Sequence, residues 1–543
     1  MKRKVIVLLV VMAMIMSMVA CSQPSEPAPQ PPADEQPGDE TPSPSDPSEP
    51  AKTTLVYGVS TDAASLDPHV QNDSHSEQIV AMLYSTLLKF EADGTIVKDL
   101  AESYEVTEDG RTWTFKLKEG VTFHNGKELT AEDVKATYER FMADDADAAR
   151  LVVKEITRMF ESVDVHDKYT VSITTDEPYG PMMALLCNRS LAIMDGDIIA
   201  EHGYQVGDFV ESTVGTGPFK IVSWRKDEEL VVERYEDYFG ENAKLEKIIV
   251  RHIPEAASRV IALENGELDM INQFPAEDLD RLEADSNIAV IKTPGVGARL
   301  FRFGCNDPII SNTLVRQAIV HAIDRDEIVE GLFPGLSYPT TGPITPVVWG
   351  YYNFGEIYQD LDKAKDLLAQ AGYPDGFDTK IVTTPRYMKG VELAEVLSSQ
   401  LSLIGINAEI EVLEWSVILP LWSGVGPDVF DQPMFIMGAG TSMMDADGAF
   451  RGLYTTTLTG TNERNYGFYS NEEVDELIYA GMSETNAEAR YELYKRAQEI
   501  LYLEDPTAIW LYDTYNTAAS ASFVKGVEIN GVGMFTWENI YID

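Results

Sequence analysis

Cysteine, histidine and basic residues are scarce in this chain of 543 residues. Its three cysteines form no CxxC pair and no cysteine-based zinc spacing, and its seven histidines form no HxH or HxxxH pair. The sequence therefore predicts neither a metal site nor a cofactor. Lys and Arg number 42 against 89 Asp and Glu, which gives a formal net charge of −47. So acidic a surface repels nucleic acid and anionic lipid headgroups, which argues against both as partners.

The motifs of common enzyme classes are also missing. The chain contains no GxSxG nucleophile elbow, no HExxH and no P-loop. Carboxylates are so abundant that any pair chosen for glycoside hydrolysis would be uninformative. The sequence favours a binding protein over an enzyme, with a secreted hydrolase as the alternative class.

The N-terminus has the pattern of an export signal. Lys2-Arg3-Lys4 precede an apolar run over residues 5–19, which is short for a membrane span and typical of a signal peptide. The run ends in Met18-Val19-Ala20-Cys21, which resembles the bacterial lipobox, with Met18 where Leu is usual. We therefore expect Cys21 to be lipidated and to hold the protein at the outer face of the cell membrane. The alternatives are an uncleaved anchor or ordinary secretion.

A proline-rich segment follows the lipobox. Residues 22–52 contain ten prolines among Ser, Glu, Asp and Gln. Such a composition cannot build a core and predicts a disordered, extended tether. At about 3 Å per residue in polyproline II geometry it could reach roughly 90 Å. The two cysteines beyond it, Cys187 and Cys305, are expected to be unpaired buried thiols, with a disulfide between them as the alternative.

Residues 94–141 form the most informative stretch of the chain. A strand through Tyr104 to Val106, a turn at Glu108-Asp109-Gly110 and an alternating strand over Thr112–Leu117 predict a hairpin. Thr130 is a good N-cap for a helix through Phe141. Asp133, three residues on, is a shorter acid than the capping box prefers. The pattern of apolar and turn residues in this stretch predicts secondary structure but no catalytic or binding site.

The residues of this stretch, "LAESYEV..DGRTWTFKLKEGVTFHNGKELTAEDV", resemble the signature region of family 5 of the extracytoplasmic solute-binding proteins, which serve peptide and nickel ABC importers. Further matches follow the family order: SLDPH at 65–69, GTGPF at 215–219, VRQAI..AIDR at 315–325, AGYPDGF at 371–377 and FYSNEEVDELI at 468–478. Several motifs in the right order, spread over residues 53–543, identify the chain as a member of this family.

The resemblance implies a two-lobed α/β fold like that of type II periplasmic binding proteins, with mixed sheets and an extra inserted subdomain. The chain would pass between the lobes twice, and Pro294, Gly295 and Gly297 supply the backbone freedom of a hinge at the first passage. The expected parts are a signal peptide (1–20), a tether (21–52), the first lobe (53–93, 207–296 and 514–543), its inserted subdomain (94–206) and the second lobe (297–513).

The resemblance also implies a function without a covalent step. The lobes would close around a short or glutathione-like peptide, and the closed monomer would dock on ABC permease subunits driven by cytoplasmic ATPases. Alternatives within the family are a metal chelate or an oligosaccharide as ligand. A lipoprotein that senses its ligand without a permease is a third possibility.

Arg386 is the first candidate for ligand binding. It follows a strand and precedes a helix, where a planar guanidinium can hold a carboxylate, as the corresponding arginine can in peptide-binding relatives. The alternative is an ordinary surface arginine. Tyr387 and Trp415 also follow strands and are expected as cleft walls, with packed core as their alternative.

The loop after the strand at Met434 to Met437 supplies the other candidates. Asp445 is expected to meet the ligand amino group; for Asp447 the alternative is a helix N-cap. Dipeptide binders carry an aspartate where this chain has Ser442, and Gly438-Ala439 replaces their usual Gly-Trp, so the standard dipeptide contact is in doubt. Arg451 is expected to form an ion pair rather than a ligand contact.

Three further expectations concern local structure. Residues 77–88 predict a helix, residues 163–174 predict a single alternating strand, and the 94–141 stretch is expected to touch little ligand.

Overall fold

The computed structural model describes residues 52–543, apart from 71–72, 144–156, 208, 425–430 and 457–464. The chain divides into two units, Met1–Pro50 and Ala51–Asp543. The predicted signal peptide, Cys21 and nearly all of the tether lie outside the described residues. Within the described ranges, no helix combines the length and apolarity needed to cross a bilayer.

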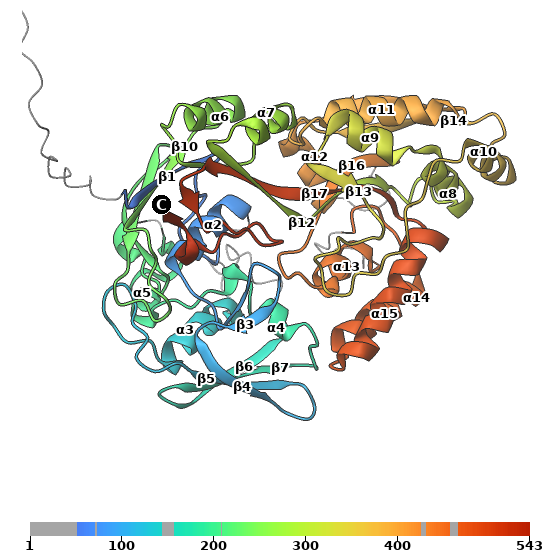
Figure 1. Ribbon diagram of the computed structural model, residues 1–543. Coiled ribbons are helices and arrows are strands. Elements are labelled where there is room, and N and C mark those ends of the chain that lie inside the picture. Colours follow the sequence, from blue (N-terminus) through green and yellow to red (C-terminus); the bar gives the residue numbers. More distant parts are fainter. Residues whose placement is uncertain (1–51, 71–72, 144–156, 208, 425–430, 457–464) are drawn as a thin grey trace, which may run out of the picture. The chain divides into compact units, whose positions relative to one another are not determined.

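One eleven-stranded sheet runs through the second unit (Figure 1). Two groups of parallel strands (β11, β1 and β10; β15, β14 and β16) are joined by antiparallel pairs, so the sheet is mixed as expected. Its order is β15 (Ile406–Val412), β14 (Phe377–Thr383), β16 (Met434–Ala439), β12 (Ile288–Phe303), β17 (Ala508–Ala521), β11 (Met270–Asn272), β1 (Thr54–Val59), β10 (Lys247–His252), β9 (Glu229–Arg234) and β8 (Phe219–Arg225), with β13 (Ser337–Pro339) paired to β17.

Strands β12 and β17 join the two halves of this sheet. They pair antiparallel from Ile288 with Ala521 to Arg302 with Ala508, and the ladder is interrupted between Pro294 and Ala298. The expected lobe boundaries, 296/297 and 513/514, fall inside these two continuous strands. In Figure 1 both strands run from the side of α6 and α7 to the side of α9.

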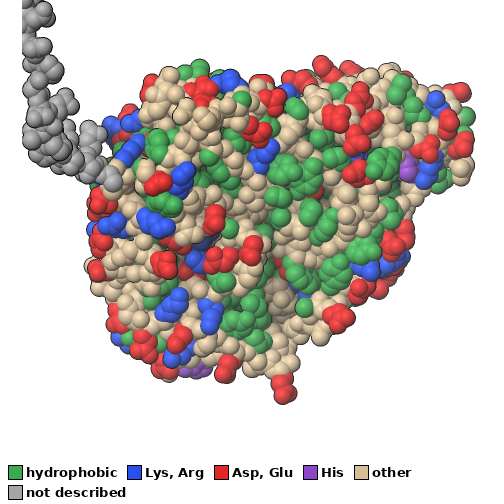
Figure 2. Space-filling view, viewed as in Figure 1, with side chains coloured by type: hydrophobic (Ala, Val, Ile, Leu, Met, Phe, Trp, Pro, Cys, Tyr) green, Lys and Arg blue, Asp and Glu red, His purple; other side chains and the backbone are tan. Residues whose placement is uncertain are grey.

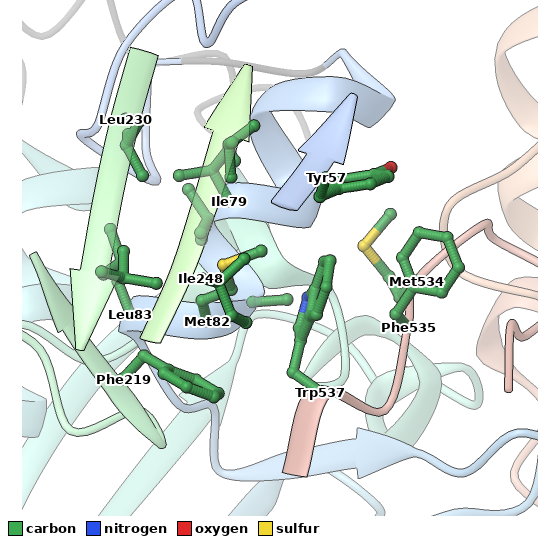
Figure 3. Packing of buried hydrophobic residues seen from close by; sticks show 14 of the residues in the cluster. Tyr57, Ile79, Met82, Leu83, Phe219, Leu230, Ile248, Met534, Phe535 and Trp537 are labelled. Atoms are coloured by element: carbon green, nitrogen blue, oxygen red, sulfur yellow. The ribbon is translucent and has the colours of Figure 1, made fainter. Parts of the chain in front are cut away.

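The first lobe is built around the β1 side of the sheet. Helices α2 (Ser74–Leu83), α6 (Ala256–Glu264) and α7 (Leu279–Ala284) belong to it. Its core brings segments far apart in sequence together, because the ring of Tyr57 on β1 packs 5.5 Å from that of Trp537 and 5.8 Å from that of Phe535 (Figure 3). The C-terminal segment, with the short pair β18 (Val524–Lys525) and β19 (Tyr541–Ile542), is therefore part of this lobe.

The second lobe contains the helices α8 to α15. Its separate core includes Phe301, Phe303, Ile319, Leu397 and Ile509, all fully buried. The helices are α8 (Thr313–Ala322), α9 (Arg325–Leu332), α10 (Leu361–Gln370), α11 (Gly390–Ser402), α12 (Trp415–Gly424), α13 (Ala446–Tyr454), α14 (Glu472–Ser483) and α15 (Ala487–Glu499).

The inserted subdomain has its own sheet and core. The strand order is β4 (Ala101–Val106), β5 (Thr112–Leu117), β7 (Thr170–Thr175) and β6 (Phe160–Asp167), accompanied by the hairpin β2 (Leu88–Phe90) and β3 (Ile96–Lys98) and by helices α3 (Ala131–Met142), α4 (Met182–Leu185) and α5 (Gly196–His202). Trp113, Phe115 and Leu117 are buried, as the alternation predicted.

Two local predictions were wrong. The single strand over residues 163–174 is the hairpin β6–β7, turned where the Asp167 carboxylate accepts from the Tyr169 amide at 2.9 Å. The helix expected over 77–88 is α2, which begins at Ser74 because Asp73 caps it, accepting from the Ser76 amide. In contrast, the capping box of α3 does form with the shorter Asp133.

Figure 2 shows acidic side chains spread over the visible face and hydrophobic ones gathered near its middle. Both described cysteines are free thiols, as expected, with Cys187 buried and Cys305 half-buried. Among the described residues, no group of three or more His, Cys, Asp or Glu side chains could hold a metal ion.

Candidate ligand-binding site

The topology brings most of the predicted site residues to one edge of the sheet. Strands β14, β15 and β16 run in the same direction, so their carboxyl ends meet there. Arg386 and Tyr387 follow β14, Trp415 follows β15, and the loop 440–445 follows β16. The crevice outside the carboxyl ends of strands is where open α/β sheets bind ligands.

Arg386, Tyr387 and Trp415 form one cluster. The Arg386 guanidinium lies 4.6 Å from the centre of the Trp415 ring, and the Tyr387 and Trp415 rings are 6.1 Å apart. Arg386 is exposed, and its side chain makes no hydrogen bond or ion pair with any described residue. Its charge is therefore free to meet an anion, with the indole face holding the guanidinium in place.

Sequence reasoning missed a second arginine beside this cluster. The Arg299 guanidinium on β12 lies 4.0 Å from the Tyr387 ring centre. Its Nε and Nη1 are shielded from solvent and have no partner among the described residues. The signal that could have found it is an arginine between the apolar Ala298 and Leu300, within the expected crossover.

Asp445 already has a protein partner. It caps α13 by accepting from the Asp447 amide at 2.9 Å, and Arg490 holds its two oxygens at 2.6 and 2.8 Å. Both side chains are about 5% exposed, and Arg490 also stacks 4.3 Å from the Trp349 ring. Burial raises the pKa of Asp445, and the bonds from Arg490 oppose that shift. In this arrangement its charge is neutralised by Arg490.

Asp447 joins the inserted subdomain to the second lobe. Its fully buried carboxylate accepts from the hydroxyls of Tyr179, in the subdomain, at 3.0 Å and of Tyr494 at 3.3 Å. Arg451 forms the expected ion pair, and its partner is Asp447, at 3.3 Å. The N-cap considered for Asp447 is Asp445 instead, because α13 begins at Ala446.

Ser442 also meets the inserted subdomain. Its hydroxyl oxygen accepts from the Asn188 side-chain amide at 2.9 Å. A second hydrogen bond joins the same two parts: the amide of Gly180 in the subdomain donates to the carbonyl of Met482 in the second lobe at 2.9 Å. These contacts hold the subdomain against the second lobe, so Ser442 lies where the two parts touch.

A cavity of about 660 Å³ opens between the inserted subdomain and the second lobe. This volume lies within the range of ligand pockets in proteins. The subdomain contributes Ile96, Val106, Thr107, Glu108, Gly110, Trp113, Gly180, Pro181, Met183 and Ala184; the second lobe contributes Trp349, Met444, Asp445, Thr485, Ala487 and Arg490; Phe90 and Gly94 complete the wall. The turn of the 94–141 stretch thus forms part of this wall. The expectation that the stretch touches little ligand stays a prediction.

The cavity is mainly apolar. Trp113, Trp349, Met183 and Met444 supply large hydrophobic surfaces, while Arg490 is neutralised by Asp445. Arg386, Tyr387 and Trp415 do not line it; the loop 440–445 connects their sheet edge to the cavity through Met444.

Residues 95–461 match the family described as bacterial extracellular solute-binding proteins, family 5 Middle. The chain belongs to this family. That family consists of solute-binding proteins of ABC importers, and its structurally characterised members share the two-lobed α/β fold seen here.

Peptide and glutathione binders are among the relatives of this family 5 member. The glutathione-binding protein GsiB of Escherichia coli is 28% identical over 457 residues, covering 84% of this chain and 88% of the relative. The structure of DppA from Helicobacter pylori in complex with the peptide STSA is 30% identical, with a TM-score of 0.77, covering 91% and 98% of the chains. HbpA2 from Haemophilus parasuis is 25% identical, with a TM-score of 0.80, covering 90% and 100%.

Proposed function

We propose that this chain is the substrate-binding lipoprotein of an ABC importer that captures short peptides between its lobes and delivers them to membrane permease subunits. The observation that carries the proposal is the 660 Å³ cavity between the inserted subdomain and the second lobe. The peptide and glutathione ligands named for its relatives point the same way.

The site residues support a peptide in particular. Arg386 offers an unpaired guanidinium, backed by Trp415, to the carboxylate of a peptide. The large hydrophobic surfaces of the cavity wall, supplied by Trp113, Trp349 and Met444, suit apolar side chains such as Leu or Phe. Contacts to both lobes then favour the closed state, so that binding shifts the population toward the form the permease recognises.

Native mass spectrometry of the protein, purified without its first 21 residues, tests the proposal. Short peptides should copurify and survive gentle ionisation. Recovery of the protein with a sugar or a metal chelate instead would support the other ligands considered for this family. Hydrolysis of chromogenic peptide or glycoside substrates by the same preparation would show a secreted hydrolase.

The membrane part of the proposal needs its own experiment. In cells, the full chain should partition into detergent and carry a lipid mass on Cys21, and Cys21→Ala should abolish both. Crosslinking of the anchored protein to permease subunits, dependent on added peptide, would distinguish an importer from a sensor that works without a permease. Gel filtration with light scattering should show a monomer.

A further inference from the structure

A buried carboxylate without a partner lies in the first lobe. Glu77 is in the first turn of α2 and is 9% exposed. Its side chain makes no hydrogen bond or ion pair with any residue that the structure describes. An ionised carboxylate is costly to bury unless a cation or several donors compensate it. Glu77 is therefore poised either to hold a proton or to meet a cationic group.

The space beside Glu77 has the size of one such group. A hollow of about 20 Å³ lies there, enough for a single water-sized occupant. All three parts of the binding unit line it. Its lining comprises Glu77, Phe90, Asn530, Val532 and Met534 from the first lobe, Cys187, Asn188 and Arg189 from the inserted subdomain, and Ser442 from the second lobe.

The second lobe supplies no free carboxylate at this place. Ser442 is the residue that reaches the hollow from its side. The two aspartates that follow it are occupied, Asp445 by Arg490 and Asp447 by two tyrosines and Arg451. Glu77 is thus the carboxylate that faces the hollow from the opposite lobe.

We propose that Glu77 binds the ammonium group at the amino terminus of a peptide ligand in this hollow, while the rest of the peptide extends toward the apolar cavity. The inference rests on the proposed peptide-binding function. Phe90 lines both the hollow and the 660 Å³ cavity, so the two spaces adjoin one side chain. A primary ammonium matches the volume of the hollow and the charge of the carboxylate.

The electrostatics give this contact a pH dependence. Burial and, to a smaller extent, the nearby Asp73 carboxylate raise the pKa of Glu77 to about 7, while the Arg189 guanidinium opposes this rise. Arg189 is the other charged side chain that lines the hollow, whereas Asn188, Ser442 and Asn530 are uncharged. Without ligand, Glu77 is partly protonated at neutral pH, so that binding an ammonium releases a proton. Peptide affinity should rise from pH 6 to pH 7.5.

The test compares two pools of Ala-Xaa-Ala tripeptides, one with free amino termini and one N-acetylated, by native mass spectrometry of the mature protein. The unmodified protein should retain members of the free pool and lose the acetylated pool, and this comparison needs no variant. Equal retention of both pools would overturn the assignment of Glu77 while leaving peptide binding intact. Retention of neither pool would instead contradict the proposed function.

A variant then assigns the effect to Glu77. Glu77→Gln should lower the affinity for a retained free tripeptide about 10- to 100-fold in calorimetry, as expected for the loss of a charged hydrogen bond. It should also remove the rise in affinity between pH 6 and pH 7.5. The control is Glu91→Gln, because Glu91 lines only the neighbouring hollow of about 30 Å³ and should leave affinity unchanged. A folded Glu77→Gln protein that binds as tightly as the unmodified one would refute the proposal.

Discussion

Replacing Asp445 by Asn separates a structural role from a ligand contact. Asn is as good an N-cap as Asp, so the bond from the Asp447 amide to this side chain should survive in α13. The change removes only the charge, which leaves the Arg490 guanidinium buried without its carboxylate. Breaking a buried ion pair in this way costs about 3–5 kcal/mol.

This free energy can be converted into a melting temperature. For the roughly 490 residues of Ala51–Asp543, a melting entropy of about 2.1 cal/mol/K per residue gives about 1 kcal/mol/K for the whole unit. The variant should therefore melt about 3–5 °C lower when unfolding is followed by circular dichroism at pH 7.5. Peptide affinity, measured on the folded variant by calorimetry, should change little.

The matched control is Asp324→Asn. Asp324 caps α9, accepting from the Glu327 amide at 2.9 Å, and forms no ion pair with a described residue. This variant should melt within about 1 °C of the unmodified protein, because Asn and Asp cap helices almost equally well. If Asp445→Asn melted normally but lost peptide binding, Asp445 would be the ligand contact that the sequence indicated, and our assignment to Arg490 would be wrong.

Three further predictions concern other parts of the unit. Asp513 is buried, and burial raises its pKa to about 8. The folded state therefore keeps a proton that the unfolded chain releases near pH 4, so the stability of the fold decreases as the pH rises from about 4 to about 8. Asp513→Asn should remove this decrease when melting curves at pH 5 and pH 8.5 are compared, and an unchanged pH dependence would contradict the assignment. Arg386→Ala should lower the affinity for peptides with a free carboxylate about 10- to 100-fold in calorimetry and leave the affinity for C-terminally amidated peptides unchanged. Equal losses of affinity for both kinds of peptide would show that Arg386 does not bind the carboxylate. A Cβ at Gly180 would lie 2.2 Å from the Glu484 carbonyl oxygen, so Gly180→Ala should hold the lobes apart in solution scattering and lower affinity, whereas Gly331→Ala, with open space around it, should do neither.

Local pattern predicted much of the scaffold. The strand β5 has the bounds expected from its alternation, and α3 begins after Thr130 as its N-cap indicated. The hairpin β6–β7 was missed because the alternation continues through its turn, where Asp167 reverses the chain. The predicted element boundaries were therefore wrong where a single side chain, rather than the periodicity of apolar residues, determines where the chain turns.

The site was predictable only where strand ends define it. The positions of Arg386 and Trp415 follow from the rule that carboxyl ends of parallel strands meet, and the structure does bring them together. The partner of Asp445 could not be foreseen, because Arg490 is 45 residues away on another helix. Glu77 resembled one more surface acid among 89, and only the packing of three separate segments makes it a buried one.

The interrupted ladder between β12 and β17 has a mechanical consequence. Over Gly295, Val296 and Gly297 no residue of β12 is in register with β17, and a second register shift follows between Arg299 and Leu300. At this point the segment is held by two hydrogen bonds outside the regular pairing, from the Thr514 hydroxyl to the Gly297 carbonyl at 3.1 Å and from the Val296 amide to the Gly531 carbonyl at 2.9 Å, so little strand pairing opposes rotation of the lobes. The energy that decides between an open and a closed molecule then resides in a few contacts far from the hinge, such as Asn188 with Ser442 and Gly180 with Met482. A ligand that binds the closed form more tightly than the open form by a few kcal/mol is therefore sufficient to keep the molecule closed.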